Sequence, residues 1–279
     1  MKTPFLVAWL AMAFTCGSSS LHAAPVTFLT AGANAAAIQG TVDNFRASLG
    51  TLNPNVAGTF GSGRREINWD GVPNSLAAPN NLPANFFNFN SPRGAVFSGP
   101  GTGFQVSANS GVAPILFDNI NPTYSTQFAT FSAQRLFTSL GSNVYDVSFF
   151  VPGASTPALV RGFGSVFTDV DTANTTSIEY FDDLNNSLGA YFALGLAGDK
   201  TLAFVGVDFG ANVVSRIRVT AGNQALGQAT TGDVVAVDDF IYGEPVARTA
   251  STVPEPSTLL LVAAAVVGGL RKRSSRGPY

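Results

Sequence analysis

The sequence predicts an all-β fold, an antiparallel β-sandwich with one helix near its N-terminal end. Short β-prone runs recur between residues 95 and 242, and each is ended by residues such as Gly, Asn or Asp, with no helical periodicity between them. Composition agrees, because only 11% of the residues are charged while 29 are Gly and 23 are Phe. Residues 24–244 are enough for one such domain between two terminal segments.

The first 23 residues are predicted to be a signal peptide. Lys2 is the only charged residue before the end of an apolar run at 5–14, and small or polar residues follow up to Ala23. A basic start, an apolar core of roughly 7–15 residues and a small residue at the cut are typical of secretory signals. Such a core is too short to cross about 30 Å of hydrocarbon, so cleavage after Ala23 is expected instead of an anchor.

Residues 33–49 are predicted to form the early helix. Apolar residues recur there at steps of four, three and four, which places them on one face of a helix: Ile38, Val42, Phe45 and Leu49. Gly50 favours the end of the helix. Residues 51–103 are dense in Pro, Gly and Asn and are predicted to form loops and short strands.

Eleven runs are predicted to form strands. They are 95–97, 104–108, 115–117, 133–138, 144–151, 159–170, 177–181, 189–194, 201–209, 213–220 and 234–242. Residues 177–194 are expected to form a hairpin around the turn-forming residues 182–186. In the run 213–220, Ile217 and Val219 face one way and Arg216 and Arg218 the other, as on a sheet with one wet face.

The last of these runs carries a resemblance. The sequence VVAVDDFIYGE at 234–244 is similar to the closing strand of jelly-roll carbohydrate-binding and lectin-like modules. The resemblance implies a jelly-roll-like sandwich, and because it covers so few residues it implies the architecture and not a sugar.

Composition excludes several kinds of site. The only cysteine, Cys16, and the only histidine, His22, both lie in the predicted signal peptide. The exported domain therefore lacks a thiol nucleophile, an imidazole base, the usual zinc ligands and the attachment site of a c-type haem. In residues 24–252 acidic side chains outnumber basic ones and Lys200 is the only lysine, so a nucleic-acid partner is not expected.

Carboxylates remain as candidates for a structural calcium ion. Asp169 and Asp171 lie two residues apart at a strand end, and Asp238 and Asp239 come from the closing strand. Calcium takes six to eight oxygen ligands, so aspartate pairs from two strands are able to supply part of a site. The alternative is that all four are solvated strand ends and turn residues.

Two further hypotheses concern sugars. Trp69, the only tryptophan after the signal peptide, stacks on a sugar ring if it is exposed, and otherwise belongs to the core with Ile67. A glycosidase needs two carboxyl groups about 5–9.5 Å apart, and the available glutamates are Glu66, Glu179 and Glu244. No local pattern marks a pair, so the sequence favours a protein without enzymatic activity.

The C-terminal segment has three parts. After an expected linker at 245–252 comes an extended motif, Val253, Pro254, Glu255, Pro256 and Ser257. An apolar stretch at 258–270 and a basic cluster at 271–273 follow it. Thirteen residues of helix span only about 20 Å, which makes a weak permanent anchor. The alternative is an ordinary tail anchor.

This arrangement resembles a PEP-CTERM protein-sorting signal. The resemblance implies processing by exosortase, a membrane-embedded cysteine transpeptidase of Gram-negative bacteria that make exopolysaccharide. It also implies transient contact of the hydrophobic helix with the inner membrane, with the basic cluster on the cytoplasmic side. Residues 253–279 are therefore expected to be a sorting signal that exosortase recognises and removes.

Together these features predict an exported cell-surface or extracellular-matrix protein with a structural or glycan-binding role in an exopolysaccharide layer. The alternatives are an enzyme that acts on the polysaccharide through paired carboxylates, and a structural surface protein without a ligand. The terminal segments are the same in all three cases, so they do not choose between them.

Overall fold

The computed structural model describes residues 24–109, 111–112, 115–228 and 231–248. The described residues from Ala24 to Ala247 form one compact unit. The predicted signal peptide, the sorting motif, the hydrophobic helix at 258–270 and the basic cluster at 271–273 lie outside the described residues. Among the helices that are described, none has both the length and the hydropathy needed to span a membrane.

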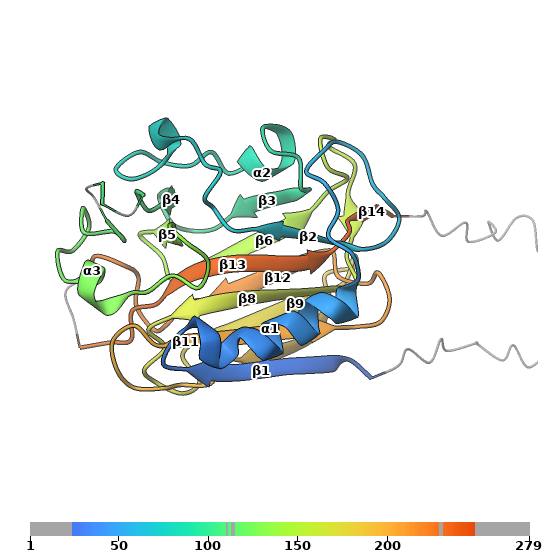
Figure 1. Ribbon diagram of the computed structural model, residues 1–279. Coiled ribbons are helices and arrows are strands. Elements are labelled where there is room, and N and C mark those ends of the chain that lie inside the picture. Colours follow the sequence, from blue (N-terminus) through green and yellow to red (C-terminus); the bar gives the residue numbers. More distant parts are fainter. Residues whose placement is uncertain (1–23, 110, 113–114, 229–230, 249–279) are drawn as a thin grey trace, which may run out of the picture. The chain divides into compact units, whose positions relative to one another are not determined.

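The larger of two antiparallel sheets has seven strands (Figure 1). Six follow the order β1-β11-β8-β13-β5-β4, and β2 pairs with β13. Their bounds are Val26–Gly32 (β1), Arg64–Ile67 (β2), Gly103–Val106 (β4), Phe137–Leu140 (β5), Gly162–Thr168 (β8), Leu202–Asp208 (β11) and Ala236–Gly243 (β13).

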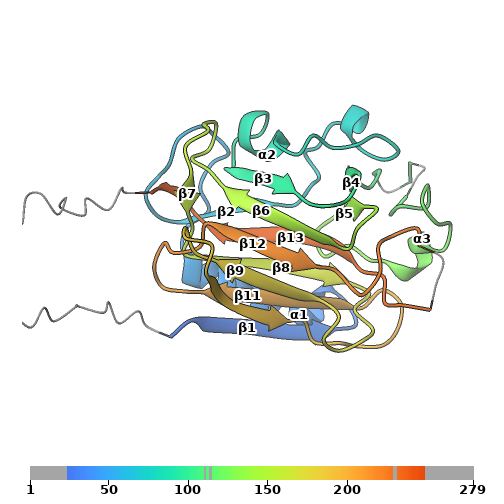
Figure 2. The ribbon, with the colours of Figure 1, turned by 180° about the vertical axis from the view of Figure 1, so that it is seen from behind.

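The smaller sheet has five strands in the order β10-β9-β12-β6-β3, seen from its own side in Figure 2. Their bounds are Ala95–Ser98 (β3), Val144–Phe149 (β6), Ser177–Phe181 (β9), Ser187–Phe192 (β10) and Arg216–Thr220 (β12). From β5 onward the chain crosses repeatedly between the two sheets, which confirms the predicted jelly-roll-like antiparallel sandwich.

Short elements complete the domain. A two-stranded ribbon joins β7 to β14, and the short helices are α2, α3 and one 3-10 turn. Their bounds are Ala158–Leu159 (β7), Val246–Ala247 (β14), Phe86–Phe89 (α2), Tyr124–Gln127 (α3) and Asn74–Leu76 (the 3-10 turn).

The main core lies between the two sheets and is rich in aromatic rings. The Tyr180 hydroxyl, from the smaller sheet, donates a hydrogen bond of 2.8 Å to the backbone oxygen of Phe163 in the larger one. The rings of Phe149 and Phe163 also meet across the interface, with centroids 6.1 Å apart. Side chains therefore alternate as the sequence predicts: Ile217 is buried while Arg218, next to it on β12, is exposed.

Helix α1 (Ala35–Leu49) packs on the outer face of the larger sheet (Figure 1). The Asn34 side chain caps its first turn by accepting from the Ala37 N–H, and Gly50 ends it at φ 97°. The predicted apolar stripe is confirmed, because its four residues are the buried ones of the helix: Ile38, Val42, Phe45 and Leu49.

Two glycines of the sheet make room for this helix. A Cβ atom added to Gly164 would lie 2.7 Å from Cε1 of Phe45, and one added to Gly206 would lie 3.0 Å from Cδ2 of the same ring. The Phe45 ring therefore rests directly on the backbone of β8 and β11, with the Phe204 ring 5.5 Å away.

Three expectations differ from the structure. The predicted strand at 115–117 is wrong, because Leu116 and Phe117 have φ values of 45° and 69° and lie in a turn. Strand β1, which begins three residues after the expected cleavage at Ala23, was not predicted. The domain also extends past residue 244, because Val246–Ala247 pairs with β7, so a free linker beginning at residue 245 is wrong.

Candidate functional site

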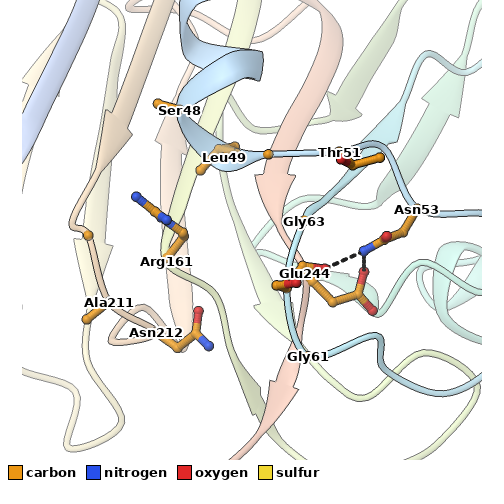
Figure 3. A pocket seen from close by; sticks show the side chains of 13 residues that line it. Ser48, Leu49, Thr51, Asn53, Gly61, Gly63, Arg161, Ala211, Asn212 and Glu244 are labelled. Atoms are coloured by element: carbon orange, nitrogen blue, oxygen red, sulfur yellow. Dashed lines mark hydrogen bonds between the residues drawn. The ribbon is translucent and has the colours of Figure 1, made fainter.

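Two cavities lie at one end of the domain and share Asn212, in the loop that follows β11. The first, of about 490 Å³, is bounded by the end of α1, the loop at 50–63, Arg161 before β8, and Glu244 after β13 (Figure 3). The second, of about 570 Å³, is bounded by the start of β1, the ribbon strand β7 and the β9–β10 hairpin. We call the two together the end groove.

Arg161 gives the first cavity a fixed cationic group. Its guanidinium donates two hydrogen bonds to Asp208, Nε to Oδ1 at 2.8 Å and Nη2 to Oδ2 at 2.7 Å. Asp208 is buried, and its Oδ1 also accepts from the Gly210 N–H, which fixes the loop that carries Asn212. The Arg161 side chain is still 37% exposed, so part of its surface is open to solvent.

Glu244 lines the same cavity, but its carboxylate is fully engaged. Both oxygens accept from the buried Arg65 guanidinium, at 2.6 and 2.9 Å. Asn53 Nδ2 donates to Oε2 at 2.8 Å, and the Phe60 N–H donates to Oε1 at 3.3 Å. This network holds the loop at 53–60 against the end of β13, so Glu244 shapes the wall and has no reactive oxygen to spare.

The second cavity has apolar walls. Six apolar residues line it: Ala24, Pro25, Leu159, Leu188, Phe209 and Val213. Asp182 and Asp183 also line it. The end groove is therefore amphipathic: polar side chains line one half and aliphatic and aromatic side chains the other.

An exposed aromatic ring borders the polar half. Phe60 is 48% exposed, and it directly precedes Gly61 and Ser62, which line the first cavity. Its ring lies over the Arg65 guanidinium, with Cζ 5.3 Å from the centroid. A cation on one face of the ring holds it in place while the rest of its surface stays accessible.

The prediction that Trp69 stacks on a sugar is wrong. Trp69 is 1% exposed, its ring stacks on Phe137 with centroids 4.4 Å apart, and its Nε1 donates to the Asp238 backbone oxygen at 3.0 Å. An indole enclosed on these sides offers no face to a ligand, so the core interpretation holds.

Asp238 and Asp239 lie in a bulge of β13, where the pairing with β8 shifts register between Val237 and Phe240. The Phe131 N–H and the Ser132 hydroxyl donate to Asp238, and burial followed by the charge of Asp239 raises the pKa of its carboxyl well above the usual range. Asp239 accepts from Ser132 at 2.6 Å. Burial also raises the pKa of Asp239.

Arg46 supplies a positive charge beside Asp239. Its Nη2 donates to Asp239 at 3.2 Å and to Glu66 at 3.0 Å, and its Nε donates to Glu66 at 3.1 Å. The three side chains line a cavity of about 250 Å³ outside the end groove. A helix residue thus neutralises two carboxylates that the sequence left without partners.

Asp169 and Asp171 belong to a different cluster, with Asp199 and Asp233. Asp169 is 6% exposed, adopts φ 69°, and its Oδ1 has no hydrogen-bond partner among the described residues. Burial, then the charges of Asp171, Asp199 and Asp233, raises the pKa of Asp169 to about 7. Asp171 is exposed and accepts from the Gly198 N–H at 2.8 Å.

The two predicted aspartate pairs therefore do not meet around one calcium ion, and that prediction is wrong. In the described ranges, no three acidic side chains converge on a point that would hold a metal ion. The glutamates are equally dispersed: Glu66 binds Arg46 and Arg64, Glu179 accepts from Ser187 on the smaller sheet, and Glu244 lies in the end groove.

Sequence reasoning missed most of the end groove. Arg161, Asn212 and Phe60 come from three loops far apart in the chain, and none lies in a recognisable motif. The available signal was weak: Phe60 is an aromatic residue in a segment of small and polar residues, where a core partner is not expected.

The comparisons with known proteins concern mainly the tail. No curated protein matches the chain. One solved structure with limited likeness is the enzymatically active domain of tailspike protein 4 from bacteriophage CBA120, at 16% identity and a TM-score of 0.26. The match covers 58% of this chain and 20% of that one. Residues 252–274 match the PEP-CTERM protein-sorting motif, so the chain carries a signal for export and for exosortase-dependent sorting to the cell envelope or surface.

Proposed function

We propose that the exported domain binds a glycan in the end groove and so holds the protein in an exopolysaccharide layer. The observation that carries the proposal is that a polar and an apolar cavity lie next to each other and share Asn212 in their linings. Sugars present hydroxyl groups at their edges and C–H groups on their faces, and an amphipathic groove satisfies both. Each cavity also falls within the roughly 300–1,000 Å³ of common ligand pockets.

Each half of the groove has a distinct role in this proposal. Arg161 and Asn212 supply donors, and Asn212 also an acceptor, for sugar hydroxyls. Phe209 and Leu188 supply the apolar wall for a ring face. Phe60 offers a separate stacking surface at the border of the polar half.

Binding without turnover is the better account of the carboxylates in the groove. The Glu244 carboxylate accepts hydrogen bonds from Arg65 and the Asp208 carboxylate accepts them from Arg161, so both are already engaged within the protein. The rival enzyme would use Glu66 and Asp239, which both contact Nη2 of Arg46. Hydrolysis of the polysaccharide by the wild-type domain, lost in Glu66→Gln, would favour that rival.

The sorting signal indicates where in the cell the domain acts. We infer that the host is a Gram-negative cell, that residues 258–270 enter the inner membrane transiently, and that exosortase then removes the tail. Mass spectrometry of the protein recovered from the envelope or medium tests this. Loss of the basic cluster at 271–273 is expected, and an intact C-terminus ending at Tyr279 would contradict cleavage.

Binding is tested by titrating the recombinant domain, residues 24–250, with the exopolysaccharide of the producing cells in a calorimeter. Asn212→Ala and Phe60→Ala are each expected to weaken binding at least about tenfold, or about 1.4 kcal/mol. Phe192→Ala is the matched control for Phe60→Ala, because Phe192 is 44% exposed and ends β10 four residues beyond Leu188 of the groove.

Saturable binding that all three variants retain would place the ligand outside the end groove. The absence of binding in the wild-type domain would favour a structural surface domain without a ligand. Either result would refute the proposed site, and only the second would also refute the proposed function.

A further inference from the structure

Strand β1 forms an open edge of the larger sheet. It pairs with β11 on one side, through seven consecutive residue pairs without a bulge, and no described strand pairs with its other side. In an antiparallel pair, alternate residues turn their N–H and C=O groups away from the partner. No described backbone or side-chain group bonds to these outward groups of Val26–Gly32. Figures 1 and 2 both show β1 at the margin of the domain.

The edges formed by β4, β3, β10 and β2 are protected. The Asn53 N–H bonds to the Arg64 oxygen of β2 at 2.9 Å, and the Arg64 N–H bonds to the Thr51 oxygen at 2.9 Å. Backbone N–H groups of Ala78 and Leu82 bond to β4 at 2.7 and 2.8 Å, so a loop covers that edge. The Phe97 N–H of β3 bonds to the Ala84 oxygen at 2.9 Å. Strand β10 carries a bulge between Ser187 and Gly189. Covering and bulging are the usual ways to prevent an edge from pairing with another chain, and β1 has neither.

The side chains of β1 also lack the usual defences. The sequence VTFLTAG contains no charge and no proline. Val26 is 56% exposed and Leu29 is 39% exposed. The edge of the smaller sheet lies on the same side, because Pro25 and Leu188 of β10 line one cavity. Phe192, at the end of β10, is 44% exposed, and Leu194, two residues further along, is 47% exposed.

We propose that β1 pairs antiparallel with β1 of a second copy of this chain, which joins the two larger sheets into one. A two-fold axis at Leu29 places Leu29 opposite its own copy, Phe28 opposite Thr30, and Thr27 opposite Ala31. Each of these pairs is uncharged, so no like charges face each other, and apolar or Thr pairs stabilise neighbouring strands.

A second copy fits this edge better than an unrelated peptide. The strand has no charge that would select a differently charged partner, and its central residues are complementary to themselves. The sorting motif at 252–274 also directs every copy to the same surface, which raises their local concentration. With cleavage after Ala23, only Ala24 and Pro25 precede β1 in the same chain.

The exported protein, purified from producing cells, is measured by light scattering after size exclusion over a range of concentrations. The wild-type protein is expected to show twice the monomer mass. Leu29→Lys places two like charges opposite each other and is expected to raise the dimer dissociation constant at least about tenfold. Val112→Lys is the matched control, because Val112 is 52% exposed and lies in a loop outside β1.

Cross-linking tests the register independently of stability. In the proposed pairing, the Cβ atoms of the two Leu29 residues are about 4.5–5.5 Å apart, close enough for a disulfide after small movements. Leu29→Cys is therefore expected to form a covalent dimer under mild oxidation, and Val112→Cys is not. A monomeric wild-type protein, or a dimer that Leu29→Lys leaves intact, would overturn the proposal. An unchanged circular dichroism spectrum of Leu29→Lys shows that the variant is folded.

Discussion

Replacing Asp169 with asparagine tests whether the acidic cluster weakens the domain above neutral pH. The Asp169 side chain is 6% exposed, its Oδ1 lacks a hydrogen-bond partner in the described part of the chain, and its pKa is raised to about 7. Burial is the main cause, and three further aspartates add to it. Asparagine removes the charge and tolerates the observed φ of 69°.

The direction of the effect follows from proton binding. The pKa of an aspartate in the unfolded chain is about 3.9, so between pH 4 and pH 7 the folded protein binds more protons than the unfolded one. The free energy of unfolding therefore falls as the pH rises through this window. A shift from 3.8 to about 7 corresponds to at most about 4 kcal/mol. Asp171 and Asp199 are exposed and screened by water, so we expect about 1–2 kcal/mol.

Urea denaturation is the assay, and Trp69 is its probe, because this buried indole is the only tryptophan after the signal peptide. The advantage of Asp169→Asn over the wild-type domain is expected to grow from pH 4.5 to pH 8. Asp118→Asn, a partly exposed aspartate outside the cluster, is expected to show no such growth. A difference between Asp169→Asn and wild type that stays constant across this range would refute the reasoning.

Three further changes test the packing and the ion pairs. Gly164→Ala brings a Cβ within 2.7 Å of Phe45 and is expected to cost about 1–3 kcal/mol in urea denaturation, whereas Gly40→Ala, on the open face of α1, is expected to stabilise by about 0.5–1 kcal/mol. Glu244→Ala leaves the buried Arg65 charge without its carboxylate and is expected to cost about 3–5 kcal/mol. Removal of divalent metals with a chelator is expected to leave the melting temperature unchanged, because Arg46 supplies the positive charge beside Asp239, and a fall of several degrees would contradict this.

The sequence was most informative where the pattern of apolar residues alone determines which face of a helix or strand is buried. The helix at 33–49 and the alternation around Ile217 were predicted correctly, because burial of an apolar stripe overrides other preferences. The hairpin at 177–194 was also predicted, since its turn lies between two β-prone runs. The run at 115–117 misled, because three apolar residues suit a left-handed turn that buries Phe117 as well as they suit a strand.

The candidate site was much less predictable. Arg161 reaches the end groove from the start of β8, and Glu244 reaches it from the end of β13, so only the sheet topology brings them together. Trp69 was open to two interpretations because its environment depends on Phe137 and Phe240, which are remote in the chain. Carboxylates also gained partners, such as Arg46 for Asp239, that no local pattern indicates.

The order of strands in the larger sheet has a consequence for secretion. Strand β13 lies between β8 on one side and β5 and β2 on the other, yet it is the last long strand in the chain. A polypeptide that leaves the cell N-terminus first delivers the neighbours of β13 before β13 itself. The sheet therefore stays in three pieces, β1-β11-β8, β5-β4 and β2, until residues 236–243 emerge. The sorting motif at 252–274 follows almost at once. The last strand that closes the larger sheet and the sorting motif therefore emerge nearly together, so the fold is completed only shortly before the chain can be sorted.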